Sequence, residues 1–341
     1  MSTDLAAAPA DAGIGNRVRE FLGTWDAAII ALTVVVLVGA SVMNSDFGSS
    51  TNFTFLVLDL APIFLIALPM TLIIVTGEID LSVASTLGLS GAAMGWMWNN
   101  GFTIEMIVPT CLLLGALLGA LNGFLVAKLG LPSLAVTIGT LALFRGLAFV
   151  LLGDQAVSNF PRAYTSWVTG TVGETSIPNI AIPLVVLAVI FGVLLQSTSL
   201  GRNIYATGAS STAAKFAGID GNRIKFWLYV VCGAVAALAG VLWSLRYSSA
   251  RADNGSGLEL SVVAAVLLGG VSIFGGKGRL VGVLAAVVLL AALQNALRLE
   301  DISNEALTVV TGVLLIVAVL LPNILTALRT ASRRRRAVRA L

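Results

Sequence analysis

The sequence predicts an all-α, polytopic membrane helix bundle of about ten transmembrane helices, with both termini in the cytoplasm. Composition is the first reason: 57% of the 341 residues are hydrophobic and only 11% are charged, and the mean hydropathy is +0.98. Water-soluble domains carry about 25% charged residues. The other two reasons are a series of apolar runs and a strong asymmetry in the placement of Lys and Arg.

The apolar runs have the length that a membrane-spanning helix needs, about 20 residues. We expect spans near 26–43, 56–76, 80–98, 106–127, 133–152, 179–197, 225–245, 258–275, 280–298 and 305–322. The third is rich in Gly and Ser, and the eighth ends in Gly-Gly pairs, so either could be tilted, broken or partly re-entrant.

Basic residues set the expected orientation, because cytoplasmic loops of membrane proteins are enriched in Lys and Arg. With the N-terminus inside, about fifteen Lys and Arg lie on the cytoplasmic side and about four on the outer side. The predicted organisation is a cytoplasmic tail (1–25), a transmembrane domain (26–322) and a basic cytoplasmic tail (323–341). The run Arg333 to Arg336 predicts attraction to anionic lipid beside the membrane, and a nucleic-acid partner is not expected.

Two predicted connections, 153–179 and 199–224, are too long to be simple turns. A weak internal echo also relates Asp80-Leu-Ser-Val to Glu259-Leu-Ser-Val, each at the head of an expected span. The echo is compatible with a transporter repeat, but two matched tetrapeptides arise easily by chance, which is the favoured interpretation.

The inner connection, 199–224, predicts a short cytoplasmic helix over Ser210 to Ala217. Ser210 is a suitable N-cap and Gly218 a suitable C-terminal stop. The small residues of this helix would let another protein approach closely.

This helix resembles the "EAA" coupling motif of ABC import permeases, which docks into the ATPase subunit. The resemblance lies in Ala213, Ala214 and Gly218, and Lys215 falls within the motif; Thr212 stands where the family often has Glu. Two further stretches are similar to the permeases for ribose, xylose, rhamnose and autoinducer 2. Their motif residues are Gly77, Glu78, Asp80 and Ser82 in the first stretch, and Gly269, Gly270, Gly275 and Gly276 in the second.

The resemblance covers about residues 50–325 and implies a set of partners. Such permeases form homodimers or heterodimers in the bacterial inner (plasma) membrane. They bind an ATP-binding cassette subunit inside and a sugar-binding protein outside. The chain itself lacks a P-loop: the nearest match, Gly276-Lys277-Gly278, has Gly in the hydroxyl position and Val271 where the first Gly is required. We therefore expect no enzyme activity and no bound cofactor here, with ATP and Mg²⁺ used by the partner.

A metal centre is not expected, because the chain has no His and its two Cys lie in apolar runs. Candidates for the translocation path are the polar residues within the expected spans: Asp59, Asn122, Arg145, Gln294 and Asn295. Each has a structural alternative, such as a helix-joining hydrogen bond or an ion pair. Glu78 and Asp80 likewise either act in ion coupling or cap and pair at the start of the third span. The outer stretch 246–259 is either a docking surface for the binding protein or a solvated loop.

The fourth expected span carries Gly115, Gly119 and Gly123 at four-residue spacing, which predicts close helix packing. The competing functional hypothesis is an ion-coupled secondary transporter of a small polar solute. A membrane-embedded enzyme would need converging catalytic groups, which the absence of His disfavours.

Overall fold

A computed structural model describes residues 24–303, 305–317 and 320. These residues form helices joined by irregular segments, and none of them belongs to a β-strand. The helices are α2 (Trp25–Met43), α3 (Ser50–Val75), α4 (Val83–Asn99), α5 (Ile104–Gly123) with a π-helical continuation η1 (Phe124–Lys128), α6 (Ser133–Leu152), α7 (Arg162–Thr169), α8 (Ala181–Ser197), α9 (Ser199–Ala209), α10 (Ser211–Phe216), α11 (Gly221–Tyr247), α12 (Leu258–Leu268) and α13 (Leu280–Leu299). A further apolar helix covers Glu305–Val317. The predicted tails lie outside the described residues, including Arg333 to Arg336, except that the predicted N-terminal tail (1–25) ends in Thr24 and Trp25, which cap and begin α2.

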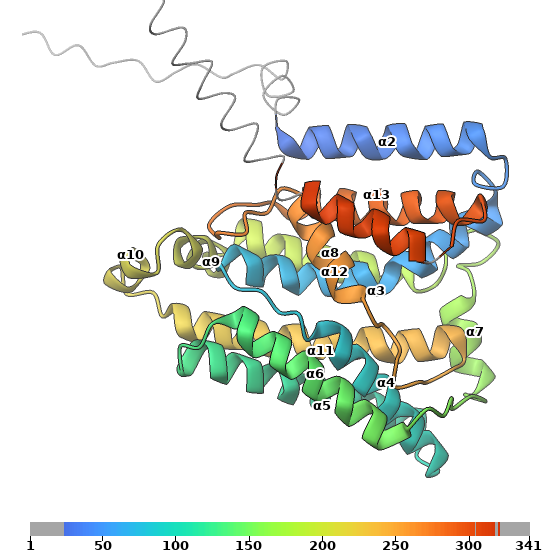
Figure 1. The fold of residues 1–341 in the computed structure, drawn as a ribbon, viewed down its shortest axis with the longest axis horizontal. Helices are drawn as coiled ribbons and strands as arrows, with labels where there is room; N and C mark the ends of the chain where they lie inside the picture. The colour runs from blue at the N-terminus through green and yellow to red at the C-terminus, as the bar shows by residue number, and fades with distance from the viewer. Residues whose placement is uncertain (1–23, 304, 318–319, 321–341) are drawn as a thin grey trace, which may run out of the picture.

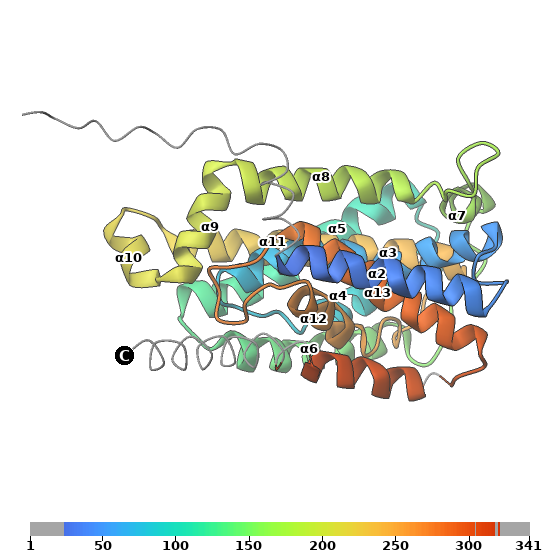
Figure 2. The same cartoon turned by 90° about the horizontal axis from the view of Figure 1, so that it is seen from above.

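The long helices run side by side in layers (Figures 1 and 2). Helix α2 covers one face and packs on α13, which in turn contacts α3 and α12. Helix α11 joins this half to the opposite layer of α4, α5 and α6. The bundle has two ends (Figure 1). We call one the α10 end, which contains α9, α10 and the loops 76–82 and 269–279. We call the other the α7 end, which contains α7 and the connections 153–180 and 248–257.

Burial distinguishes central from peripheral helices. Helices α3 and α4 are buried along most of their length. In contrast, α2, α5, α6 and α8 expose large apolar side chains such as Val35, Leu113, Val150 and Val185. Apolar side chains facing outward along whole helices fit a surface solvated by lipid.

Six of the described helices are long and apolar enough to cross a membrane, or seven if the bent pair α8–α9, with its 66° kink, is one span. The expected third span becomes α4, with 17 residues. The expected eighth becomes α12, with 11 residues, followed by an irregular segment. Apolar composition continues to Ile273, but Gly270 has φ +88°, a conformation that ends a helix. The number of spans therefore stays a prediction.

The two long connections contain more helix than the sequence predicted. Helix α9 precedes the expected cytoplasmic helix, and Thr198 caps it by accepting a hydrogen bond from the backbone N–H of Gly201. Helix α7 lies within 153–179.

Close packing through glycine, predicted for the fourth span, is confirmed. A Cβ on Gly115 would lie 2.3 Å from the carbonyl oxygen of Gly233, and one on Gly119 would lie 2.1 Å from that of Tyr229. Gly123 approaches Phe226 in the same way, at 2.9 Å. Helices α5 and α11 thus touch backbone to backbone, an approach that small residues permit.

Candidate functional site

An irregular segment, residues 76–82, leads from the α10 end into the bundle and starts α4. Gly77 turns the chain with φ +84°. The carboxylate of Asp80, only 2% exposed, accepts hydrogen bonds from the backbone N–H of Ser82 at 2.9 Å and from its hydroxyl at 2.6 Å. Asp80 thereby organises the chain just before the first turn of α4.

Neighbouring helices fix this segment. The amide nitrogen of Asn122 in α5 donates to Ser82 Oγ at 2.8 Å. The hydroxyl of Tyr229 in α11 donates to the carbonyl of Ile79 at 3.2 Å, and the N–H of Ile79 donates to Ser133 Oγ at 3.3 Å. Glu78 forms an ion pair with Lys225 at 2.5 Å, and both side chains are less than 20% exposed.

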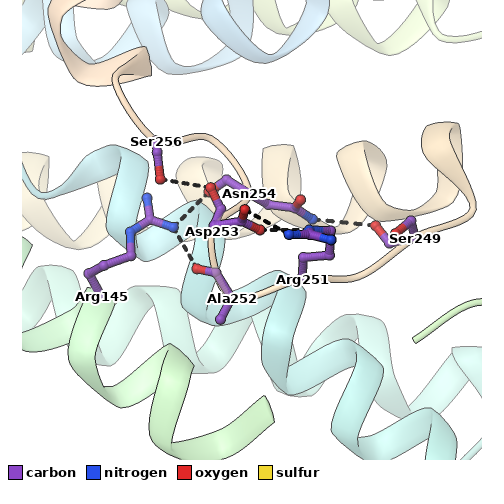
Figure 3. Close-up of polar contacts among 7 residues, drawn as sticks. All are labelled: Arg145, Ser249, Arg251, Ala252, Asp253, Asn254 and Ser256. Atoms are coloured by element: carbon purple, nitrogen blue, oxygen red, sulfur yellow. Dashed lines mark hydrogen bonds and ion pairs between the residues drawn. The ribbon is translucent and has the colours of Figure 1, made fainter. Parts of the chain in front are cut away.

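A second irregular segment, residues 248–257, leads inward from the α7 end to α12 (Figure 1). Arg145 in α6 fixes it, as Figure 3 shows: its Nη1 donates to the carbonyls of Ala252 at 2.6 Å and Asn254 at 2.9 Å. Its Nη2 donates to the carbonyl of Ala84 in α4 at 3.2 Å. One guanidinium thus connects three parts of the chain.

Gly88 in α4 leaves the space that this guanidinium occupies. A Cβ at Gly88 would lie 2.4 Å from Arg145 Nη1 and 2.9 Å from the carbonyl oxygen of Asn254. Any larger residue at this position would displace the Arg145 side chain or the segment.

Arg251 and Asp253 form an exposed pair on the same segment, with Nε–Oδ1 at 2.8 Å and Nη2–Oδ2 at 3.0 Å (Figure 3). The hydrogen bond from Arg251 lowers the pKa of Asp253 below its usual value. A two-residue bridge between Val157 and Ala250 ties the segment to the connection before α7. The pair therefore lies on a supported part of the chain, with about half of each side chain exposed.

Asp59 lies near the α7 end of α3 and is paired with two arginines. Its Oδ1 bonds Arg246 and its Oδ2 lies 3.2 Å from Arg298 Nη1. The Arg246 guanidinium also lies over the ring of Tyr247, 4.8 Å from its centroid. The sequence-predicted path residue Asp59 is thus part of an ion-pair cluster.

The remaining predicted path amides join helices. Asn295 in α13 and Asn52 in α3 exchange two hydrogen bonds, at 2.9 and 3.1 Å. Gln294 donates to Thr311 Oγ1 at 3.1 Å. The structure does not bring the five predicted path residues together at one place; whether any of them contacts the solute stays a prediction.

The α10 end carries the expected short helix. The Ser210 hydroxyl accepts a hydrogen bond from the N–H of Ala213 at 3.2 Å, and Gly218 has φ +78°. The N-cap and the stop are therefore where the sequence predicted them. Of the motif residues, Ala214 is buried and Thr212, Ala213 and Lys215 are exposed. Phe216 is 90% exposed, which is unusual for so large an apolar side chain.

The motif glycines of the segment 269–279 pack closely against neighbouring backbone. Gly275 and Gly276 both have positive φ, and the N–H of Gly276 donates to the carbonyl of Val75 at 2.8 Å. A Cβ on Gly276 would lie 2.8 Å from Ala209 Cα, and one on Gly208 would lie 1.8 Å from the Val75 oxygen.

Gly269 and Gly270 are constrained in the same way. A Cβ on Gly269 would lie 2.4 Å from Val283 Cα, and one on Gly270 would lie 2.5 Å from Trp25. The second motif stretch therefore has a structural reason for its glycines.

Sequence reasoning missed Tyr205, Tyr229 and Ser133. The Tyr205 hydroxyl donates to the carbonyl of Gly278 at 2.6 Å, which ties α9 to the segment before α13. Each of the three contacts a backbone group of a residue more than fifty positions away, so no local pattern marks it. Within the described ranges, no group of three or more Cys, Asp or Glu is arranged to hold a metal ion.

Long apolar helices, glycine-packed contacts and irregular segments that enter from both ends are typical of membrane transport proteins. The chain matches the family model "Branched-chain amino acid transport system / permease component" over residues 52–319. It belongs to this family of transport permeases, which is not a family of enzymes. It is a multi-pass protein of the bacterial inner membrane.

Curated relatives narrow the class. The autoinducer 2 import system permease protein LsrD of Escherichia coli (strain K12) is 33% identical over 304 residues, covering 86% of this chain and 91% of the relative. The proteins of the same description from Shigella flexneri and Escherichia coli O157:H7 give the same values. No solved structure matches the chain.

Proposed function

We propose that this chain is the membrane permease subunit of an ATP-driven, binding-protein-dependent importer of a monosaccharide or of the furanosyl signal autoinducer 2. The observation that carries the proposal is its similarity to an autoinducer 2 import permease over 91% of that protein's length. The chain supplies the translocation path, and its partners supply the energy and most of the selectivity. The substrate class is inferred from the relative, an autoinducer 2 import permease, and from the sugar-permease motifs of the sequence.

The ATPase subunit is proposed to bind at the α10 end. Phe216 is 90% exposed there and Phe274, in the turn before α13, is 81% exposed. Both lie beside basic residues, Lys215 and Lys277, so they face water or headgroups and not the hydrocarbon. Apolar side chains this exposed in water are typical of a surface that a protein partner covers.

The contacts around Gly276 support a route for coupling. The turn that carries Phe274 packs on Ala209, which immediately precedes the N-cap of α10, and on Val75 at the end of α3. Interfaces packed this closely shift as units and do not deform gradually. A movement of α10 would therefore reach α3 and α13 directly.

If the ATPase subunit binds at the α10 end, that end faces the cytoplasm and the α7 end faces outward.

Ten membrane crossings are proposed, with α4 and α12 as shortened spans that begin at the irregular segments. The exposed pair Arg251–Asp253 at the α7 end is a proposed contact for the sugar-binding protein. A second permease, identical or related, completes the path, and lipid covers the apolar faces.

Gly218 tests the coupling assignment, because it ends α10 with a positive φ. Replacing Gly218 with Val should uncouple ATP hydrolysis from uptake in the reconstituted transporter. The matched control is Gly130→Val: Gly130 also has a positive φ, lies in a loop at the same end, and a Cβ there meets no atom within 4 Å. Uptake that persists in Gly218→Val while membrane levels stay normal would contradict the assignment.

The alternative is an ion-coupled secondary transporter. It needs a carboxylate in the membrane that exchanges an ion or proton. Glu78 and Asp59 are each paired with a base, and Asp80 accepts hydrogen bonds from Ser82. Their arrangement therefore has a structural explanation.

A further inference from the structure

A cavity of about 510 Å³ opens at the α7 end, far from α10. The start of α3, the connection 169–176 and the end of α11 line it. These elements lie together at that end in both views (Figures 1 and 2). None of the five path residues predicted from the sequence lines this cavity, and neither do the motif residues.

Eight of the eleven described residues that line the cavity carry a side-chain hydroxyl. The lining side chains that carry one are Ser50, Thr51, Thr54, Thr169, Thr171, Thr175, Ser176 and Tyr247. The hydroxyls of Thr54, Thr169 and Thr175 already donate to backbone carbonyls, so their oxygens remain as acceptors for the hydroxyl groups of a ligand. That of Thr54 donates to the carbonyl of Ser176 at 2.8 Å, which holds the two walls of the cavity together.

One charged side chain, Arg246, is in the described lining of the cavity, and it is paired with the carboxylate of Asp59, which is not a lining residue. Arg298 shares that carboxylate. No Asp or Glu is among the described lining residues, so a cation or a zwitterion lacks a partner for its positive charge, whereas a neutral ligand needs none.

Two aromatic rings complete the site. Phe55 is 53% exposed and Tyr247 is 49% exposed, and both line the cavity. Ring faces pack against the apolar face of a ligand, while hydroxyls bond its polar edge. A monosaccharide, with the volume of about six waters or roughly 180 Å³, fits within the cavity with room for hydrating water.

We propose that this cavity is an entry site that binds the neutral, polyhydroxylated solute transiently before the solute passes between the helices. The proposal rests on the proposed function and adds to it a place on this chain where the solute is bound. Neutral hydroxyl oxygens that mainly accept hydrogen bonds predict weak binding, which suits a site that must release its ligand.

Cysteine labelling tests the site in the complete transporter with its ATPase and binding protein. The native Cys111 and Cys232 are buried, so a cysteine introduced by Thr51→Cys is the accessible thiol among the described residues. An uncharged maleimide serves as the reagent. Thr103→Cys is the matched control, since Thr103 is exposed at the same end, makes no capping hydrogen bond and lies outside the cavity.

The expected result has two parts. Labelling of Thr51→Cys should reduce initial uptake about tenfold, a loss equivalent to about 1.4 kcal/mol of binding. A solute present at three times its dissociation constant should slow labelling about fourfold by mass action. Ribose, xylose, rhamnose and autoinducer 2 are tested separately, with leucine as a zwitterionic control, and Thr103→Cys should show neither effect.

Several results would overturn the proposal. Labelling that no sugar slows excludes a solute site, and protection by leucine alone excludes the neutral class. Loss of binding-protein stimulation without solute protection makes the surface a docking face. Thr169→Cys on the opposite wall must repeat the pattern, and it replaces Thr51→Cys should that variant fail to assemble. Normal ATP-dependent uptake by the unlabelled variants keeps the proposed function intact even when the entry site fails.

Discussion

The segments 76–82 and 248–257 enter the bundle from opposite ends, and different chemistry holds each in place. Around 76–82, a buried carboxylate, Asp80, accepts bonds from the chain's own Ser82, and the rest of the segment is held by neutral groups of α5, α6 and α11 and by the ion pair between Glu78 and Lys225. Around 248–257, a single cation, Arg145, bonds the segment's carbonyls. The first segment is held by contacts spread over several side chains, whereas one guanidinium makes the charge-assisted bonds that hold the second.

Arg145 also links the two regions, because its Nη2 bonds Ala84 in the first turn of α4. The sequence echo between Asp80 and Glu259 does not extend to their contacts. Asp80 precedes its helix by three residues and is buried, whereas Glu259 lies in the first turn of α12 and is partly exposed. The difference predicts that single substitutions damage the α7 end more than the α10 end.

Removal of the guanidinium should have the largest effect. Arg145→Ala leaves three backbone carbonyls without their donor, and we expect a loss of about 3 kcal/mol in the free energy of unfolding. The measurement is thermal unfolding in detergent, together with protease cleavage within 248–257. Arg145→Lys retains the charge and should lose less. A cleavage rate unchanged in Arg145→Ala would mean that the segment does not depend on this residue.

Displacement of the guanidinium by crowding comes next. Gly88→Ala places a Cβ 2.4 Å from Arg145 Nη1, and overpacking of this kind costs about 2 kcal/mol. Its matched control is Gly139→Ala in α6, where a Cβ meets no atom within 4 Å. The two variants are compared by thermal unfolding. Equal stability of both would refute the close packing of Arg145 against α4.

Substitution of Asp80 separates a structural role from an ionic one. Asp80→Ala removes the acceptor for Ser82 and should cost about 1 kcal/mol. Asp80→Asn retains an acceptor oxygen and should preserve both stability and ATP-driven uptake. Loss of uptake in Asp80→Asn with normal stability would favour the ion-coupled alternative.

Neutralisation of Glu78 should have the smallest effect. Glu78→Gln removes the charge from the partly buried pair with Lys225 but leaves an amide oxygen that can accept from the ammonium, so the loss should stay below about 1 kcal/mol. The loss should be similar at low and high salt, because salt screens partly buried pairs only weakly. A stability loss as large as that of Arg145→Ala would erase the contrast between the two segments.

Sequence reasoning predicted the features that depend on local pattern. The spacing of Gly115, Gly119 and Gly123 predicted the close packing that occurs with α11, and Ser210 and Gly218 predicted the ends of α10. In both cases the sequence signal lies in residues within a few turns of one another. Family motifs also predicted the permease family, which the relatives confirm.

Features that depend on distant parts of the chain were not predictable. Arg145 bonds backbone carbonyls 107 and 109 residues away, and carbonyls carry no sequence signal. Asn52 and Asn295 pair across 243 residues. The early end of α12 depends on how Gly269 and Gly270 pack against Val283 and Trp25, so apolar composition alone overestimated that helix.

The most direct test of the central claim is uptake by reconstituted vesicles, since a permease that only supplies a path cannot concentrate solute alone. With the ATPase subunit, the sugar-binding protein and ATP present, labelled monosaccharide or autoinducer 2 should accumulate, and it should not accumulate when the ATPase is omitted. Accumulation by the purified chain alone, driven by a sodium or proton gradient, would contradict the account.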